Sequence, residues 1–183
     1  MLLGIDEVGR GALAGPLVVS CVALERNVSG LKDSKKLTNL KRNQLYYDIF
    51  LSSKFVSLGW VWPHEIDLYG LTKATQIAIL RAINNLNIKD NFSIIIDGNY
   101  NYLEGLNYDV KTIIKADDKI KEVSAASIVA KVSRDNYMKK IDRCFPLYNF
   151  KTNVGYGTKE HINAIKSQGP SQIHRSLFLK KIT

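Results

Sequence analysis

Residues 92–96, with the sequence FSIII, are apolar on both faces of the strand that they would form. Such a strand needs a helix on each side, because all of its side chains must be covered. Apolar residues also recur at three- and four-residue intervals over 71–86, and a long helix is expected over 122–141. The chain is therefore expected to form an α/β fold with helices on both faces of a sheet.

Further strands and helices complete this expected fold. Runs rich in β-branched residues predict strands at 2–6, 17–24, 55–62 and 110–114. Helices are expected from a cap at Thr38 to about residue 50, and over 158–166 before the stop at Gly169. Three strands come first, helix and strand then alternate, and a helical tail follows. A length of 183 residues suits one domain.

The charge and the cysteines limit the class of protein. Lys and Arg number 26 against 17 Asp and Glu, so the net charge is +9. This excess favours a polyanionic partner, with nucleic acid, a membrane surface and the ribosome open at this point. Cys21 and Cys144 form no CxxC or Cys/His cluster, which favours a reducing compartment. Asp6 and Glu7 interrupt the N-terminus too early for a signal peptide, so we expect a cytoplasmic protein.

Acidic residues stand at the ends of three expected strands. Asp6 and Glu7 end the first, Asp97 ends the fourth, and Asp117 follows the fifth. Neighbouring strand ends converge on one crevice, where carboxylates can share Mg²⁺ or Mn²⁺. A turn residue explains any one of them, but four together favour a metal site. Asp6 and Glu7 point to opposite faces of an ideal strand, so both can serve one site only if the strand ends or bends there.

The segment 9–15, GRGALAG, resembles a dinucleotide-binding fingerprint. Its last interval is one residue too long, and Pro16 and a strand leave no room for the phosphate-binding helix. The backbone N–H groups of this glycine-rich loop, with Arg10, are suited to gripping a sugar-phosphate backbone. A tight turn is the structural alternative.

Basic residues cluster near these points, among them Lys131 and Arg134 on the long helix, and solvated helix faces explain many of them, as for the pair of Lys131 and Asp135. Lys35, Lys36 and Lys119 are the candidates for phosphate contacts. Tyr156 stands between two glycines, where its ring is either exposed for stacking on a sugar or base, or packed in a turn.

The histidines offer no catalytic triad. His64, His161 and His174 are scattered along the chain, and nothing in the sequence pairs any of them with a nucleophilic Ser or Cys.

Five strings read in order resemble the ribonuclease HII family: GIDEVGRGALAGP, DSKKL, IIIDG, KADDKIKEVSAASIVAKVSRD and GYGT. The likeness runs from residue 4 to about residue 161. It implies a ribonuclease H-like α/β fold, a five-stranded mixed sheet flanked by helices, with a catalytic domain over 1–145 and a short helical C-terminal extension over 146–183. The related ribonuclease HIII usually carries an extra N-terminal domain, whereas the first strand starts at once here, which favours HII.

The resemblance also implies roles for individual residues. Asp6, Glu7, Asp97 and Asp117 match the family's catalytic carboxylates. In the family these bind two metal ions, Mn²⁺ or Mg²⁺. The backbone grip on the ribose 2′-hydroxyl is matched by Gly9, Arg10 and Gly11. Tyr156 matches the tyrosine that senses the RNA–DNA junction. Asp118 is an extra acid where the family often has Ser, and Val154 stands where Lys is common.

The resemblance predicts a metal-dependent endonuclease. It would hydrolyse the RNA strand of RNA/DNA hybrids and cut 5′ of ribonucleotides embedded in duplex DNA, leaving 5′-phosphate and 3′-hydroxyl ends. The expected partners are these nucleic acids, with no membrane; a monomer is expected, and a replication or repair partner stays open. The alternatives are another nuclease of the ribonuclease H fold and a non-catalytic nucleic-acid-binding module.

Overall fold

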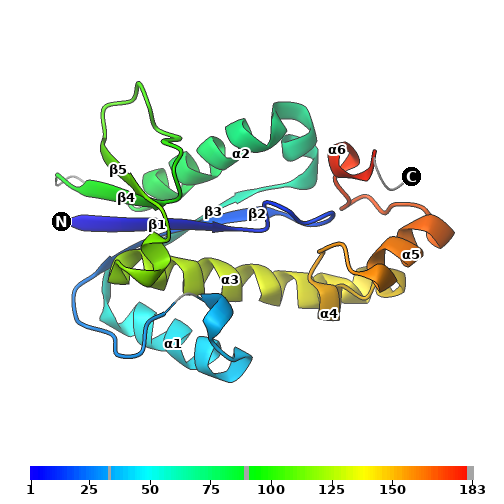
Figure 1. Ribbon diagram of the computed structural model, residues 1–183, viewed down its shortest axis with the longest axis horizontal. Coiled ribbons are helices and arrows are strands. Elements are labelled where there is room, and N and C mark those ends of the chain that lie inside the picture. Colours follow the sequence, from blue (N-terminus) through cyan, green and yellow to red (C-terminus); the bar gives the residue numbers. More distant parts are fainter. Residues whose placement is uncertain (33, 89–90, 181–183) are drawn as a thin grey trace.

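The computed structural model describes residues 1–32, 34–88 and 91–180 (Figure 1). Its sheet has the strand order β3-β2-β1-β4-β5. The strands are β1 (Leu2–Val8), β2 (Leu17–Leu24), β3 (Ser53–Val61), β4 (Ser93–Asp97) and β5 (Asp109–Ile113). β2 is antiparallel to β1 and β3, whereas β4 is parallel to β1 and β5. The predicted five-stranded mixed sheet is confirmed.

The helices cover both faces of this sheet. They are α1 (Asn39–Ser52), α2 (Pro63–Asn85), α3 (Lys121–Ile141), α4 (Phe150–Asn153), α5 (Lys159–Gln168) and α6 (Ser176–Leu179), with short 3-10 turns η1 (Ser34–Lys36), η2 (Ala116–Asp118), η3 (Asp142–Cys144) and η4 (Pro146–Tyr148). Figure 1 shows α2 on one face, α1 and α3 on the other, and α4 to α6 gathered at the end to which β1 points. In the described part of the chain, no helix is long and apolar enough to cross a membrane.

Two glycines let the helices lie close to the sheet. A Cβ on Gly4 of β1 would come within 2.2 Å of the Glu122 carbonyl carbon, so α3 touches this strand with its backbone. A Cβ on Gly59 of β3 would come within 1.8 Å of the Ala78 oxygen in α2. The start of α3 therefore lies directly against the central strand β1.

The start of α2 differs from the prediction. The helix begins at Pro63, before the apolar pattern that starts at residue 71. Gly70, with φ 74° and ψ 163°, interrupts the helical backbone and makes a kink within α2. Leu68 and Tyr69 just before the interruption are exposed. Within residues 63–70 only Pro63 and Ile66 are buried, so this first part of α2 has no continuous apolar stripe that would have revealed it in the sequence.

The segment after residue 145 packs against the rest of the molecule. One buried apolar cluster contains Leu13, Ala14, Met138, Tyr148, Phe150, Ile165 and Leu179. It therefore joins the β1–β2 loop and the end of α3 to η4, α4, α5 and α6. Both backbone amides at the start of α6 donate to the Asp67 carboxylate of α2, from Ser176 at 2.8 Å and from Leu177 at 3.0 Å. The division between residues 145 and 146 stays a prediction.

Candidate active site

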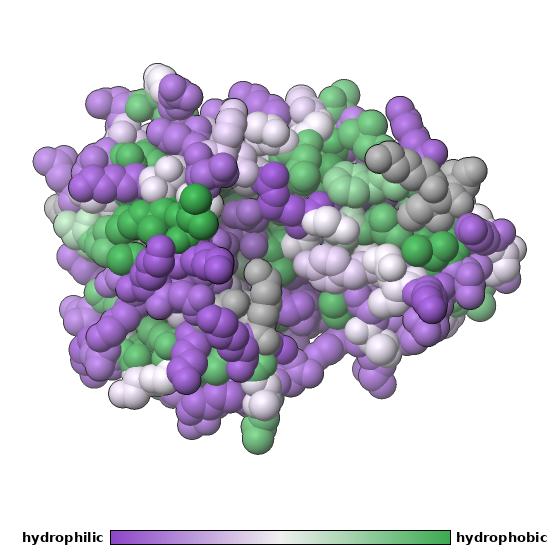
Figure 2. Space-filling view, in the orientation of Figure 1, coloured by the Kyte–Doolittle hydropathy of each residue, from purple (hydrophilic) through white to green (hydrophobic). Residues whose placement is uncertain are grey.

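The strand register places two aspartates at an open end of the sheet. Parallel pairing between β1 and β4 stops at Ile5–Ile96, and the next residues are Asp6 and Asp97. A pocket of about 370 Å³ opens here, lined by Asp6, Glu7, Val8, Ser34, Asp97, Ser127, Lys131 and Tyr156. Figure 2 shows that hydrophilic side chains predominate on the face of the molecule in this view. The convergence predicted for these strand ends is present for Asp6, Glu7 and Asp97.

Asp6 and Glu7 both line this pocket although β1 continues past them, so the expectation that the strand would end at Asp6 for them to share a site is wrong. The strand continues to Val8, which pairs with Val18 of β2. The Glu7 amide donates to Asp6 Oδ1 at 2.8 Å. Burial is the main cause that raises the pKa of Asp6 well above its usual range, and the negative charge of Glu7 adds to it. The pocket thus concentrates negative charge where little water can screen it.

Asp97 connects the pocket to the turn that carries Asp117. Asp97 Oδ1 accepts a hydrogen bond of 2.7 Å from the Ala116 amide at the start of η2. Lys115 enters this turn with a left-handed φ of 56°. Asp117 is 8% exposed and is not among the described residues that line the pocket. Among the described residues, no three Asp, Glu, His or Cys side chains are grouped so that they could hold a metal ion.

The loop after β1 follows Val8, which lines the pocket, but Gly9, Arg10 and Gly11 are not among the described residues that line it. Gly9 has φ 90°, and a Cβ there would lie 2.3 Å from Arg134 Nε, so a side chain cannot be accommodated. A Cβ on Gly11 would meet no atom within 4 Å, so a ligand can approach this position. The Arg10 side chain lies 3.7 Å from Glu7 and donates to Thr75 Oγ1 at 3.1 Å.

Two arginines behind this loop are fully buried. Arg134 donates to the carbonyl oxygens of Pro16 (2.8 Å), Val154 (2.8 Å) and Ala14 (3.1 Å). Arg175 donates to Gly15 O from Nε at 3.0 Å and from Nη2 at 2.8 Å, and to Arg10 O at 3.0 Å. The solvated helix faces that explain many basic residues therefore do not apply to Arg134, which is 0% exposed.

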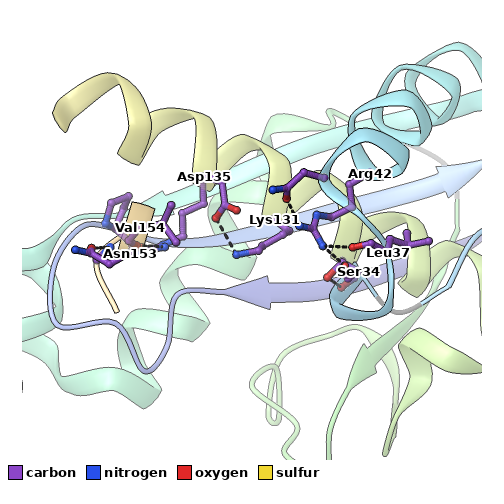
Figure 3. Close-up of polar contacts among 12 residues, drawn as sticks. Ser34, Leu37, Arg42, Lys131, Asp135, Asn153 and Val154 are labelled. Carbon is purple, nitrogen blue, oxygen red and sulfur yellow. Dashed lines mark hydrogen bonds and ion pairs between the residues drawn. The ribbon is translucent and has the colours of Figure 1, made fainter. Parts of the chain in front are cut away.

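Tyr156 lines the pocket and is half-buried. Its ring lies 5.3 Å from the Arg134 guanidinium and 5.8 Å from Lys131 Nζ. Figure 3 shows Lys131 on α3 directed toward Asp135, between Ser34 on one side and Val154 on the other. The ring is thus neither fully exposed nor packed away, and it shares the pocket with the acids.

The predicted phosphate contacts differ in their surroundings. Lys36 Nζ contacts both oxygens of Asp118, at 2.6 and 2.7 Å. Lys119 is exposed and donates to Ile114 O at 2.9 Å. The side chain of Lys35 lies outside the described residues. Arg42 donates to the carbonyl oxygens of Ser34 and Leu37, which holds the loop that carries Lys36 (Figure 3). All three phosphate assignments stay predictions.

Two of the histidines that are scattered in the sequence lie together in the structure. His161 Nε2 and His174 Nε2 are 3.0 Å apart, and His161 Nδ1 lies 2.8 Å from the Tyr156 carbonyl oxygen. No periodicity in the sequence could reveal this contact, because it depends on how α5 packs against the segment before α6.

A mixed sheet of this order, with acids at the open ends of its central strands, defines a ribonuclease H-like nuclease. The chain matches the Ribonuclease HII family over residues 3–181. It is 42% identical over 180 residues to ribonuclease HII of Thermotoga maritima, covering 97% of this chain and 73% of that protein. The protein of Caldicellulosiruptor bescii is 42% identical over 183 residues, covering 99% and 87%. The protein therefore belongs to the ribonuclease HII family.

Solved structures agree with this assignment. Ribonuclease H2 of Pyrococcus horikoshii superposes with a TM-score of 0.80 at 30% identity, covering 99% of this chain and 96% of that one. Ribonuclease HII of Archaeoglobus fulgidus, solved as a complex with PCNA, gives 0.81 at 26% identity, covering 96% and 94%. The family consists of endoribonucleases that act on the RNA of RNA/DNA hybrids, so the protein is an enzyme and the alternative of a non-catalytic module is removed.

Proposed function

We propose that this endoribonuclease also cuts 5′ of single ribonucleotides embedded in duplex DNA, and that divalent cations bound by Asp6, Glu7, Asp97 and Asp117 are required. The products would carry 5′-phosphate and 3′-hydroxyl ends. The observation that carries the proposal is one pocket lined by Asp6, Glu7, Asp97 and Tyr156, next to a backbone loop that a ligand can approach.

The donor chemistry of the pocket suits a hard cation. Its acids offer only carboxylate oxygens, the ligands that Mg²⁺ and Mn²⁺ prefer. The raised pKa of Asp6 has like charges among its causes, and a cation would relieve that repulsion. Bound cations would supply activation of a water molecule and stabilisation of the departing 3′-oxygen. Because the described acids do not form a ready-made chelate, their side chains would have to converge when a cation binds.

The loop of Gly9, Arg10 and Gly11 would read the ribose. A 2′-hydroxyl both donates and accepts hydrogen bonds, so backbone groups can recognise it where a side chain would be too bulky. The open space at Gly11 supports this role. Tyr156 would pack its ring on the next sugar, whose missing 2′-hydroxyl leaves an apolar face. Together the two contacts would mark a ribose that is followed by a deoxyribose.

The proposal extends to partners and location. Nucleic acid would be bound by a monomer through its positive surface, with Lys35, Lys36 and Lys119 on phosphates. The complex of the Archaeoglobus relative with PCNA supports a replication partner for this chain as well. The free thiol of exposed Cys144 is in keeping with the cytoplasm.

The test is a cleavage assay on two duplexes of one sequence, one with a single ribonucleotide and one with a continuous RNA strand. We expect cutting of both in Mg²⁺ or Mn²⁺, none in EDTA, and a 5′-phosphate on the downstream fragment. Cleavage of the continuous hybrid alone would refute the proposed action on single ribonucleotides. Cleavage that persists in EDTA would refute the metal requirement.

A further inference from the structure

The two buried histidines behind Tyr156 form a chain of hydrogen bonds with a defined direction. The Ser171 amide lies 2.9 Å from His174 Nδ1, and because an amide can only donate, this nitrogen must be the acceptor. Neutral His174 then carries its proton on Nε2 and donates it to His161 Nε2 at 3.0 Å. His161 in turn carries its proton on Nδ1 and donates it to the Tyr156 carbonyl at 2.8 Å. Each link fixes the tautomer of the next.

The surroundings of the pair keep both rings neutral. His161 is 0% and His174 is 5% exposed, and the rings of Tyr148 and Phe150 pack against both. Burial lowers the pKa of His161, and burial followed by the neighbouring His161 lowers the pKa of His174 to about 4. An added proton would have to displace the Ser171 donor or the link between the two rings.

Within the described residues, the groups that face the pair carry no negative charge. They are the two aromatic rings, the Ser171 amide and hydroxyl, and the Tyr156 carbonyl. The Tyr148 hydroxyl donates to Gly169 O at 2.7 Å, away from the imidazoles. Arg175, which follows His174, directs its guanidinium to the carbonyls of Gly15 and Arg10. These surroundings offer an imidazolium no carboxylate partner, so the neutral pair is a stable arrangement.

The chain of hydrogen bonds ends on the residue whose placement matters most for the proposed junction sensing. Tyr156 sits in a turn with little freedom, since Gly155 has φ 87° and a Cβ there would lie 2.3 Å from Ala14 O. The Tyr156 amide donates to Asn153 O at 2.9 Å, and its carbonyl also accepts from the Thr158 amide at 2.9 Å. The imidazole of His161 adds a side-chain bond that ties this peptide to the first turn of α5.

We propose that His161 and His174 are positioning residues for Tyr156, and that through them the C-terminal segment sets how well the enzyme recognises an RNA–DNA junction. The inference rests on the proposed role of Tyr156 in the junction. Neither histidine lines the pocket. Their loss should therefore change the selectivity between substrates more than the cleavage of a continuous hybrid.

The test compares two replacements of His161. His161→Phe fills the aromatic site but offers no donor, whereas His161→Asn can still donate an amide N–H to the Tyr156 carbonyl. We expect His161→Phe to lower single-turnover cleavage at one embedded ribonucleotide about tenfold more than cleavage of the continuous hybrid, and His161→Asn to restore most of the ratio. The same replacements at exposed His64 serve as controls and should leave the ratio unchanged.

A spectroscopic measurement decides the proposal without any cleavage. Side-chain ¹⁵N spectra of the wild type at pH 7 should show a proton on Nδ1 of His161 and on Nε2 of His174. The ¹³C-labelled Tyr156 ring should change its signals in His161→Phe and regain them in His161→Asn. Opposite tautomers, or a Tyr156 ring unaffected by His161→Phe, would overturn the proposal. An equal loss of cleavage on both substrates in His161→Phe would also overturn it. If the wild type cuts only the continuous hybrid, the proposed function is refuted, and the spectra alone then decide whether the histidines position Tyr156.

Discussion

In the pocket at the ends of β1 and β4, Asp6 is 9% exposed and lies beside Glu7, and like charges and burial both raise its pKa. Behind the same pocket Arg134 and Arg175 are 0% exposed, yet their guanidinium groups donate six hydrogen bonds to backbone carbonyls. The two regions therefore differ in hydrogen bonding rather than in electrostatic cost. Burial lowers the pKa of Arg134, and burial followed by the charge of Arg134 lowers the pKa of Arg175 to about 9, but the six carbonyl contacts offset this cost in the free protein. The first region is suited to bind cations, and the second to hold the loops that meet the substrate.

The largest expected effect is a loss of cleavage when one of the proposed metal-binding carboxylates is removed. Asp97→Asn and Asp117→Asn should each lower cleavage by about 10³-fold or more, the scale of losing a group that stabilises transition-state charge, while the protein stays folded. Circular dichroism and single-turnover rates in Mn²⁺ check this. Asp118→Asn is the matched control, because Asp118 pairs with Lys36 at the surface and should cost less than about threefold. If Asp118→Asn loses most of its cleavage activity and Asp117→Asn loses little, Asp118 rather than Asp117 is the metal ligand.

For the buried arginines the expected effect is a loss of stability. Arg175→Met keeps the length of the side chain but leaves the carbonyls of Gly15 and Arg10 without their donor, so the free energy of unfolding should fall by about 3 kcal/mol. Urea denaturation measures this. Lys166→Met, at an exposed position of α5, should stay within about 0.5 kcal/mol of the wild type. Equal stability of Arg175→Met and the wild type would show that the buried guanidinium contributes nothing to the fold.

Tyr156, where the two regions meet, should affect selectivity. Tyr156→Ala should lower cleavage at a single ribonucleotide about tenfold more than cleavage of a continuous hybrid, because only the single ribonucleotide presents a deoxyribose to the ring. If the Tyr156 hydroxyl bonds the ribose, the loss of selectivity in Tyr156→Phe should lie between that of the wild type, which is none, and that of Tyr156→Ala. Single-turnover rates on both substrates decide it, and equal losses would reduce Tyr156 to general positioning.

The smallest effect concerns phosphate contacts outside both regions. Lys119→Met should flatten the slope of log affinity against log salt by about 0.9, measured on an uncleavable hybrid in Ca²⁺. Lys36→Met should flatten it less, because Asp118 already neutralises Lys36 in the free protein. Unchanged slopes in both variants would remove these lysines from the interface.

The sequence predicted the acid region much better than the arginine region. Each acid follows a short apolar run, and strand ends converge in any α/β sheet, so local patterns were enough to group Asp6, Glu7 and Asp97. The burial of Arg134 and Arg175 and the contact between His161 and His174 depend on residues more than ten positions away, and no periodicity reports such contacts. Most lysines and arginines are exposed, so nothing in the sequence pointed to the burial of these two.

The contrast between the two regions is tested most directly by the stability of Asp6→Asn without metal. Because folding raises the pKa of Asp6 above its ordinary value of 3.8, its carboxylate destabilises the folded state once the pH exceeds that value. At pH 7 in EDTA, urea denaturation should show Asp6→Asn more stable than the wild type by about 1 kcal/mol, and added Mn²⁺ should stabilise the wild type more than the variant. An Asp6→Asn protein that is less stable than the wild type in EDTA would contradict the account.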